Sequence, residues 1–223
     1  MGRTIILGDI HACSDEVEAL FNKVGLNLDD TVYAIGDIFD RGPSNSKILA
    51  QFSQGVQFFS IKGNHERKHL LIRDGKCRAS LSQELTKKEL GEDYPKLLEY
   101  VEKLPNYLGL DGAILVHGAL EPGIPLPEQK EHVLVSSISG QRHLEKNYPK
   151  PWYELADFGK PIIFGHKVYE RPFVYNNRVF GIDTGCCNGK SLTAIVLPEF
   201  KLYSVKARRD YWGEKKGSKQ ELM

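Results

Sequence analysis

Five short apolar runs in this chain end abruptly at polar motifs that contain glycine. Runs of β-branched and aromatic residues bounded by glycine are typical of buried strands. Helices are expected between the first three runs, from about Asp15 to Val24 and near 44–52, and another begins near Glu66. This β-α-β-α-β order predicts right-handed crossovers and a mostly parallel sheet core. The five predicted strands cover residues 4–8, 31–36, 56–62, 113–116 and 161–164.

The second half of the chain is predicted to be largely antiparallel. Turn signals at Asp111-Gly112, Asn176-Asn177 and Pro198-Glu199 separate pairs of apolar runs. Residues 75–106 show polar helical patterns instead, which predict a helical insertion beside the sheet. The proline-rich stretch 121–161 has weak periodicity, with one helix expected near 139–147. A long excursion of this kind, which follows a strand, is more often functional than a linker.

Metal-binding side chains stand at the ends of the predicted strands. In open α/β sheets, sites form outside the carboxyl ends of the strands. We therefore expect the side chains that follow the five runs to meet in one place. They are Asp9, His11, Asp37, Asn64, His117 and His166.

These residue types suit a two-metal hydrolytic site. Hydrolysis of a phosphate ester at neutral pH needs deprotonated water in line with phosphorus and neutralised phosphate oxygens, and two cations about 3.5–4 Å apart supply both. Asp37 is the candidate bridge, because a carboxylate has two oxygens. Arg41 is placed to fork onto phosphate oxygens. Asp40 can keep His65 oriented and protonated as a general acid.

Length, composition and charge restrict the other possibilities. A chain of 223 residues with 41% hydrophobic and 26% charged residues fits one large soluble domain. The net charge of +1 argues against stable nucleic-acid binding. No apolar stretch approaches the roughly 20 residues that a membrane span needs. The four cysteines form no C-x-x-C motif and the N-terminus shows no signal-peptide pattern, so we expect a reduced, cytoplasmic protein. Oligomeric state cannot be inferred from the sequence.

The motifs resemble those of calcineurin-like metallophosphoesterases, in the phosphoprotein-phosphatase branch. Within it, short bacterial and phage serine/threonine phosphatases and symmetrical diadenosine tetraphosphatases are the most similar. The resemblance rests on Gly-Asp-Ile-His at 8–11, Gly-Asp-Ile-Phe-Asp-Arg-Gly at 36–42, Gly-Asn-His-Glu at 63–66, His-Gly at 117–118, Gly-His at 165–166 and Ile-Asp-Thr-Gly at 182–185. It implies an α/β (α+β) fold of four layers, a central β-sandwich of mixed sheets flanked by helices. One such domain is expected over residues 1–205, followed by a basic, solvated C-terminal tail over 206–223.

The resemblance also implies a role for each site residue. Asp9 and His11 bind the first metal and Asp37 bridges, while Asn64, His117 and His166 bind the second. His65 and Asp40 form the acid pair, and Arg41 contacts phosphate. The implied cofactors are two divalent ions, most often Mn²⁺, although Fe, Zn, Ni and Co can occupy similar shells.

Two positions depart from the family's pattern. Ala12 stands where a glycine normally follows the histidine of the first motif. The family also uses a second phosphate-binding arginine between its fourth and fifth motifs. Arg142 is the only arginine between His117 and His166, but the residues around it differ from the family's usual aromatic context. Substrate binding by Arg142 is therefore an expectation from position alone.

The predicted reaction is metal-dependent hydrolysis of a phosphomonoester, in a phosphoprotein or a small molecule, by in-line attack of a metal-bridging hydroxide. The alternative substrate is diadenosine tetraphosphate, cleaved symmetrically, and the pocket built from residues 119–160 has to discriminate between them. Nucleic-acid phosphodiester cleavage is less expected, because the nuclease branch ends in Gly-His-x-His and Val168 replaces the second histidine. A catalytically silent metal-binding scaffold should lack a ligand, and none is missing.

Overall fold

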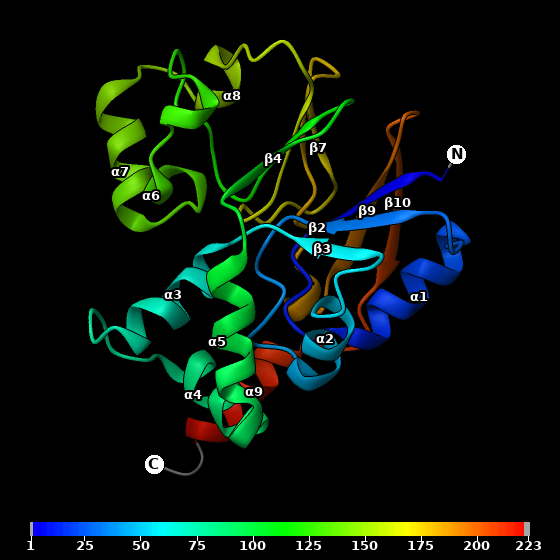
Figure 1. The fold of residues 1–223 in the computed structure, drawn as a ribbon, viewed down its shortest axis with the longest axis vertical. Coiled ribbons are helices and arrows are strands. Elements are labelled where there is room, and N and C mark those ends of the chain that lie inside the picture. Colours follow the sequence, from blue (N-terminus) through cyan, green and yellow to red (C-terminus); the bar gives the residue numbers. More distant parts are fainter. Residues whose placement is uncertain (1, 221–223) are drawn as a thin grey trace.

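Two five-stranded sheets pack against each other, with helices over both outer faces (Figure 1). The computed structural model describes residues 2–220, except for the side chains of 218–220. The first sheet contains β1 (Thr4–Leu7), β2 (Thr31–Ala34), β3 (Phe58–Ser60), β9 (Ser191–Leu197) and β10 (Lys201–Lys206). The second contains β4 (Tyr107–Gly109), β5 (Ile114–Val116), β6 (Ile162–Phe164), β7 (Phe173–Tyr175) and β8 (Val179–Gly181).

Both sheets mix parallel and antiparallel pairs. The first has the strand order β10-β9-β1-β2-β3 and the second the order β4-β5-β6-β8-β7. The pairs β1–β2 and β2–β3 are parallel, and so are β5–β6 and β6–β8. The antiparallel pairs are β1–β9 and β9–β10 in the first sheet, and β4–β5 and β7–β8 in the second.

The helices lie in two groups, one on the outer side of each sheet (Figure 1). The helices α6 (Glu131–Leu134), α7 (Ile138–Asn147) and α8 (Trp152–Leu155) gather on the side of the second sheet. The others are α1 (Ser14–Val24), α2 (Asn45–Phe52), α3 (Asn64–Arg73), α4 (Leu81–Leu90), α5 (Tyr94–Lys103) and α9 (Tyr211–Gln220). The described residues also contain short 3₁₀ helices, which are η1 (Gly91–Asp93), η2 (Leu126–Glu128) and η3 (Cys186–Asn188).

Alternation along the strands builds the four layers. Ile6 of β1 packs with Leu115 and Ile163 of the second sheet, between the sheets. Its neighbours Ile5 and Leu7 point the other way and pack against α1 and α2. Successive side chains of a strand face opposite sides, so a strand covered on both faces is apolar throughout. The predicted fold class, a sandwich of mixed sheets flanked by helices, is confirmed.

The local signals predicted the elements better than their pairing. The three hairpins β4–β5, β7–β8 and β9–β10 are antiparallel, as the turn signals indicated. Gly25 ends α1 in the left-handed conformation, with φ +67°, as a helix stop does. The expectation of a largely antiparallel second half was incomplete, because β5, β6 and β8 form a parallel core. The residues joining β5 to β6 include the proline-rich stretch, which gives no local signal for a parallel pairing.

The prediction of a solvated tail from Lys206 was wrong for the part that the structure describes. Tyr211, the first residue of α9, is buried, and its hydroxyl donates to Glu16 Oε1 at 2.8 Å. Lys215 Nζ donates to the Gly42 carbonyl at 2.7 Å. Aromatic residues at 211 and 212 supply an apolar anchor within the basic stretch. Residues 221–223 of the predicted tail lie outside the described range.

None of the helices in residues 2–220 has the length and apolar character that crossing a membrane requires.

Candidate metal centre and active site

Parallel strands bring the motifs together. The polar residues follow the carboxyl ends of β1, β2, β3, β5 and β6, which are parallel within their sheets. Backbone hydrogen bonds then join neighbouring motif loops: His11 N–H donates to Asp37 O, and Gly165 N–H donates to His117 O, both at 2.9 Å. The structure therefore places the six predicted ligands in one region at the edge of the sandwich.

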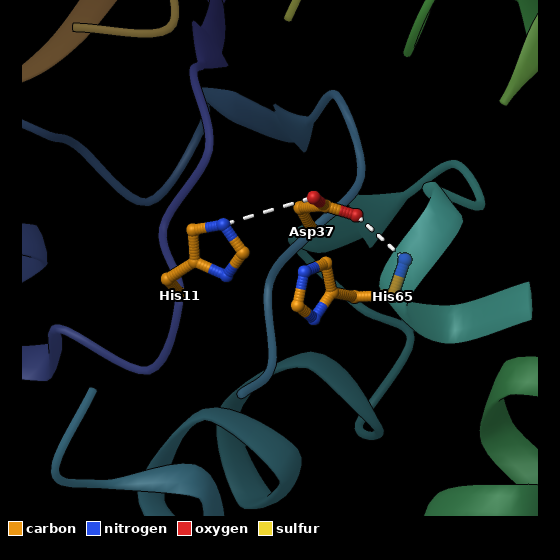
Figure 2. A group of neighbouring side chains, drawn as sticks. All are labelled: His11, Asp37 and His65. Carbon is orange, nitrogen blue, oxygen red and sulfur yellow. Dashed lines mark hydrogen bonds and ion pairs between the residues drawn. The ribbon is translucent and has the colours of Figure 1, made fainter. Parts of the chain in front are cut away.

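Asp37 belongs to two groups of possible metal ligands. One group is His11, Asp37 and His65, and the other is Asp37, His117 and His166, with the ligand atoms of each group within 4.8 Å of one another. His11 Nε2 lies 3.7 Å from Asp37 Oδ2, and His117 Nε2 lies 3.4 Å from Oδ1. Figure 2 shows Asp37 between His11 and the backbone nitrogen of His65. Each carboxylate oxygen thus faces a different group.

The arrangement of Asn64 and His117 shows that the site suits a cation. His117 Nδ1 donates to the Ile35 carbonyl at 2.9 Å, so its Nε2 carries a lone pair. That lone pair faces Asn64 Oδ1 at 3.0 Å and Asp37 Oδ1 at 3.4 Å. Three electron-pair donors converge with no proton between them, an arrangement that a metal ion stabilises. The donor set fits a divalent cation.

His11 is held as a neutral ligand of the same kind. Its Nδ1 donates to the Phe39 carbonyl at 2.9 Å, which leaves the lone pair on Nε2. Arg41 Nη1 lies 3.0 Å from that Nε2, and a guanidinium can only donate. Arg41 therefore reaches the ligand cluster itself.

The direction of the pKa shift divides the histidines of the site into two classes. Burial lowers the pKa of His11 to about 3 and that of His166 to about 4, and it also lowers the pKa of His117. These rings are neutral at pH 7, as metal ligation requires. Burial also disfavours the charged form of His65, but the Asp37 charge and the Asp40 hydrogen bond outweigh it and raise the pKa of His65. His65 is therefore the ring suited to carrying a proton.

Asp9 and Asp183 are crowded by burial and by the charges of neighbouring carboxylates. Burial and the charges of Asp183 and Asp37 raise the pKa of Asp9 well above its usual range. Burial also raises the pKa of Asp183 to about 6. Asp9 belongs to neither ligand group; both its oxygens accept the His166 backbone N–H at 3.2 Å. Bound cations would offset the repulsion among these carboxylates.

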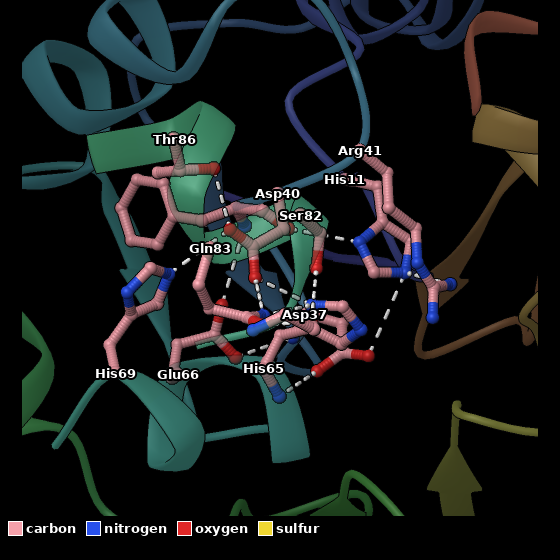
Figure 3. Close-up of polar contacts among 12 residues, drawn as sticks. His11, Asp37, Asp40, Arg41, His65, Glu66, His69, Ser82, Gln83 and Thr86 are labelled. Atoms are coloured by element: carbon pink, nitrogen blue, oxygen red, sulfur yellow. Dashed lines mark hydrogen bonds and ion pairs between the residues drawn. The ribbon is translucent and has the colours of Figure 1, made fainter. Parts of the chain in front are cut away.

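Asp40 anchors a buried polar network behind the site (Figure 3). Its Oδ2 accepts from His65 Nδ1 at 2.6 Å and from Gln83 Nε2, while its Oδ1 accepts from His69 Nε2 at 3.0 Å and from Thr86 Oγ1. Burial opposes ionisation, yet these hydrogen bonds hold the pKa of Asp40 well below its usual range. The predicted pairing of His65 with Asp40 is present in the structure.

Glu66 fastens the loop that carries Asp37. Its fully buried carboxylate accepts four backbone N–H groups, from Gly63, Asp37, Ile38 and Phe39, at 2.7–3.3 Å. Gly36 lies where a Cβ would come within 2.9 Å of His117 Nδ1, and its φ of +90° favours glycine. The motif's glycine and glutamate are therefore structural, and they set the position of Asp37 relative to the third motif.

Several site residues adopt left-handed backbone conformations. Values of φ between +46° and +71° occur at His11, Ala12, Asp37, Asp40, Arg41 and His166. Such conformations cost about 1–2 kcal/mol for a residue with a Cβ, and they cluster at functional sites. Ala12 is buried at φ +55°, which explains why glycine is usual at this place in the family.

The structure does not bring Arg142 to the cluster. Arg142 is exposed on α7, and its neighbour Gln141 reaches the site instead, with Nε2 2.8 Å from His166 Nε2. Sequence reasoning missed Gln141, Gln83 and Thr86, whose helices carry no motif. His69 was also missed, although its position four residues after His65 on one helix face was a usable signal.

Named phosphoesterases are similar to this chain over most of its length. The family model for calcineurin-like phosphoesterases matches residues 2–181. The asymmetrical bis(5'-nucleosyl)-tetraphosphatase PrpE of Oceanobacillus iheyensis is 29% identical over 237 residues, covering 94% of this chain and 94% of that protein. The symmetrical bis(5'-nucleosyl)-tetraphosphatase of Hamiltonella defensa is 24% identical over 253 residues, covering 85% of this chain and 92% of that protein.

Two solved structures share the fold. A candidate diadenosine tetraphosphatase superposes with a TM-score of 0.75 at 24% identity, over 92% of this chain and 94% of its own. A metallophosphoesterase from Sphaerobacter thermophilus superposes with a TM-score of 0.57 at 18% identity, over 99% of this chain and 93% of its own. Both superpositions agree with the mixed-sheet architecture. Since the family model matches residues 2–181 of 223, this chain belongs to the calcineurin-like phosphoesterase family, whose members are hydrolases of phosphate esters.

Proposed function

We propose that this protein hydrolyses bis(5'-nucleosyl) tetraphosphates at a two-metal centre built around Asp37. One observation carries the proposal: the two oxygens of the Asp37 carboxylate face two separate groups of ligands. A bridging carboxylate is what holds two cations close enough to act on one phosphate. In this proposal Asp9 and His11 complete one shell, and Asn64, His117 and His166 complete the other.

We expect two divalent ions, with Mn²⁺ the leading candidate. The proposed ligands are two carboxylates, one amide oxygen and three neutral imidazoles, a mixed set that also suits Fe, Zn, Ni or Co. Bound ions would neutralise the phosphate oxygens and lower the pKa of an adjacent water. All other steps fall to the protein's own side chains.

Arg41 and His65 have separate tasks in this mechanism. Arg41, 3.0 Å from His11 Nε2, forks onto the non-bridging oxygens of the phosphate under attack. As the water oxygen, whose proton passes to solvent, bonds to phosphorus, the bond from phosphorus to the bridging oxygen breaks. His65, held through Nδ1 by Asp40, has Nε2 left to give a proton to that departing oxygen. Asp40 stays ionised and orients the ring.

The names of the relatives support the choice of substrate. The relatives from Oceanobacillus iheyensis and Bacillus velezensis, both 29% identical, are named as asymmetrical enzymes. The relative from Hamiltonella defensa, named as symmetrical, is 24% identical. We therefore propose asymmetrical cleavage. Cleavage between the first and second phosphates of diadenosine tetraphosphate gives AMP and ATP, whereas symmetrical cleavage gives two ADP.

A panel of substrates tests the proposal. With Mn²⁺ present, kcat/KM is measured for diadenosine tetraphosphate, a phosphoserine peptide and p-nitrophenyl phosphate, and the nucleotide products are separated by anion exchange. We expect the dinucleotide to have the highest kcat/KM and to yield AMP and ATP. A higher value for the phosphopeptide would support the phosphomonoesterase function that the motifs first predicted. Two ADP would contradict the asymmetrical cut alone.

A further inference from the structure

A pocket of about 610 Å³ opens directly beside the second ligand group. Gly118, Gly165 and His166, from the loops after β5 and β6, form one side of it. The segment that covers the outer face of the second sheet, with α7 and α8, forms the other. The volume lies in the range of small-molecule sites. The pocket therefore connects the metal-binding loops with the part of the chain that carries no motif.

Much of the lining of this pocket is aromatic. Five aromatic residues line it: Tyr148, Trp152, Tyr153, Phe164 and Tyr169. The Trp152 ring stands nearly perpendicular to that of Phe164, at 80° with centroids 5.2 Å apart, and Tyr153 lies 6.0 Å from Trp152. Phe164 is buried, whereas Trp152 and Tyr153 are only partly covered. Residues that only filled a core would be enclosed, so the two partly covered rings offer a surface to a ligand.

Polar and charged groups stand at the near side of the pocket and at its rim. Gln141, 2.8 Å from His166, marks the side of the metal-binding loops. Lys150 and Lys167 also line the pocket, and both side chains are exposed. The lining thus combines polar and charged groups, among them Glu145 as well as the two lysines, with partly exposed aromatic surface at Trp152 and Tyr153. A ligand that carries both anionic groups and a planar ring system matches this combination.

We propose that this pocket binds one nucleoside of the substrate, with its base against Trp152 and Tyr153. The 5'-phosphate chain then leads past Gln141 to the loops of His117 and His166. This inference deepens the proposed function and rests on it for the identity of the ligand. Aromatic side chains stack on any base, so the wall fixes a nucleoside in place without selecting strongly among bases. The proposal assigns Trp152 and Tyr153 as the residues that favour a nucleoside over a phosphate ester without a base.

Two ligands that share one phosphate monoester isolate the contribution of the base. AMP and ribose 5-phosphate present the same group to the metals, and only AMP carries a base. Their dissociation constants are measured by isothermal titration calorimetry on Mn²⁺-loaded protein, a readout that needs no turnover. We expect the wild type to bind AMP about 10- to 100-fold more tightly, the range of one base–aromatic stack.

Substitution then locates the stacking surface. Trp152→Leu keeps apolar volume but removes the extended ring, and should reduce the preference for AMP at least about fivefold. Trp152→Phe should restore part of it. Trp212→Leu is the matched control, because it makes the same change in the second tryptophan of the chain, which lies on α9. It should keep the wild-type preference for AMP. The ratio of two constants within one variant cancels any change in the fraction of folded protein.

The outcomes distinguish a failure of the proposed base binding from a failure of the proposed reaction. Equal affinity of the wild type for AMP and ribose 5-phosphate would refute the proposal that the pocket binds the base, even if diadenosine tetraphosphate is hydrolysed. Binding of phosphotyrosine as tight as that of AMP would also overturn it, because the wall would then be a general aryl site. A preference for AMP that depends on Trp152, in a protein that leaves diadenosine tetraphosphate intact, would support the pocket and refute the proposed reaction.

Discussion

Replacement of Asp40 by asparagine tests the assignment of His65 as an acid. Asp40 is fully buried and accepts four side-chain hydrogen bonds, two at each oxygen. Asparagine has one acceptor oxygen and an NH₂ group in place of the other. Gln83 can turn its amide and Thr86 its hydroxyl to adapt, but a histidine N–H can only donate. One of the two histidines therefore faces a donor.

The cost in stability follows from that count. Losing one hydrogen bond to a buried charge, and leaving a buried N–H unpaired, should destabilise the folded state by about 2–4 kcal/mol. The pKa of His65 should also fall, because Asp40 no longer opposes the effect of burial. At neutral pH a larger fraction of His65 would then lack the proton that the leaving group needs.

The effect on rate should depend on the leaving group. Phenolate is a poor leaving group and needs the proton, whereas p-nitrophenolate departs readily without it. We expect Asp40→Asn to lower kcat/KM for phenyl phosphate about 100-fold or more, the usual scale of general acid catalysis. For p-nitrophenyl phosphate the loss should be less than about tenfold. Nucleotide leaving groups should resemble p-nitrophenolate.

The assay compares both esters with Mn²⁺ present, below the unfolding temperature measured by circular dichroism. Thr86→Val is the matched control, because it removes one hydrogen bond to Asp40 at the oxygen that does not face His65. It should destabilise the protein by about 1–2 kcal/mol and leave the ratio of the two esters unchanged. Equal slowing of both esters in Asp40→Asn would refute the acid role and leave Asp40 only a structural one.

Three further predictions concern residues around the site and in the fold. Glu66→Gln should lose one of the two acceptor oxygens, and with it two of the four backbone hydrogen bonds, and destabilise the protein by about 2–5 kcal/mol in urea unfolding. An unchanged midpoint would show that Glu66 does not stabilise the Asp37 loop. The hydrogen bond from Arg3 lowers the pKa of Asp30 to about 2, below its ordinary 3.8. Asp30→Asn should therefore cost about 1–2 kcal/mol at pH 7, since Arg3 is partly exposed, and this difference should shrink as pH falls from 4 toward 2; a difference independent of pH would count against the pair. Lys215→Met should cost about 1 kcal/mol and raise KM for p-nitrophenyl phosphate, because Gly42 directly follows Arg41; an unchanged KM would show that α9 does not position that loop.

The sequence predicted which side chains lie close together because its signals are local. Each predicted ligand closely follows a strand, and parallel strands of one sheet end at the same edge, so Asp37 could be placed beside Asp9, and His117 beside His166. The packing of the two sheets then brings Asp37 and His117 together. The sequence assigned His65 an acid role from its position beside Asn64, whereas the structure also groups its ring with His11 and Asp37. The pairing of His65 with Asp40 was predicted from the charge of a nearby carboxylate, and the structure contains it.

The remaining features depend on contacts between distant segments. Gln83 and Thr86 hold Asp40 from α4, more than 40 residues away, and nothing in that helix indicates its partner. Gln141 reaches His166 from α7, while the adjacent Arg142, favoured by its residue type, is exposed. The aromatic pocket likewise forms only when residues 148–153 fold over β6. Residue type alone indicates neither the direction of a side chain nor its distant partner.

Manganese binding tests the central role of Asp37 most directly. Metal-free wild type and Asp37→Asn are titrated with Mn²⁺ by calorimetry, with Asp30→Asn as the control for the same change far from the site. We predict two equivalents in the wild type and in Asp30→Asn, and loss of both in Asp37→Asn, because one carboxylate serves both ligand groups. Two equivalents bound to Asp37→Asn with wild-type affinity, or a single equivalent in the wild type, would contradict a bridged two-metal centre.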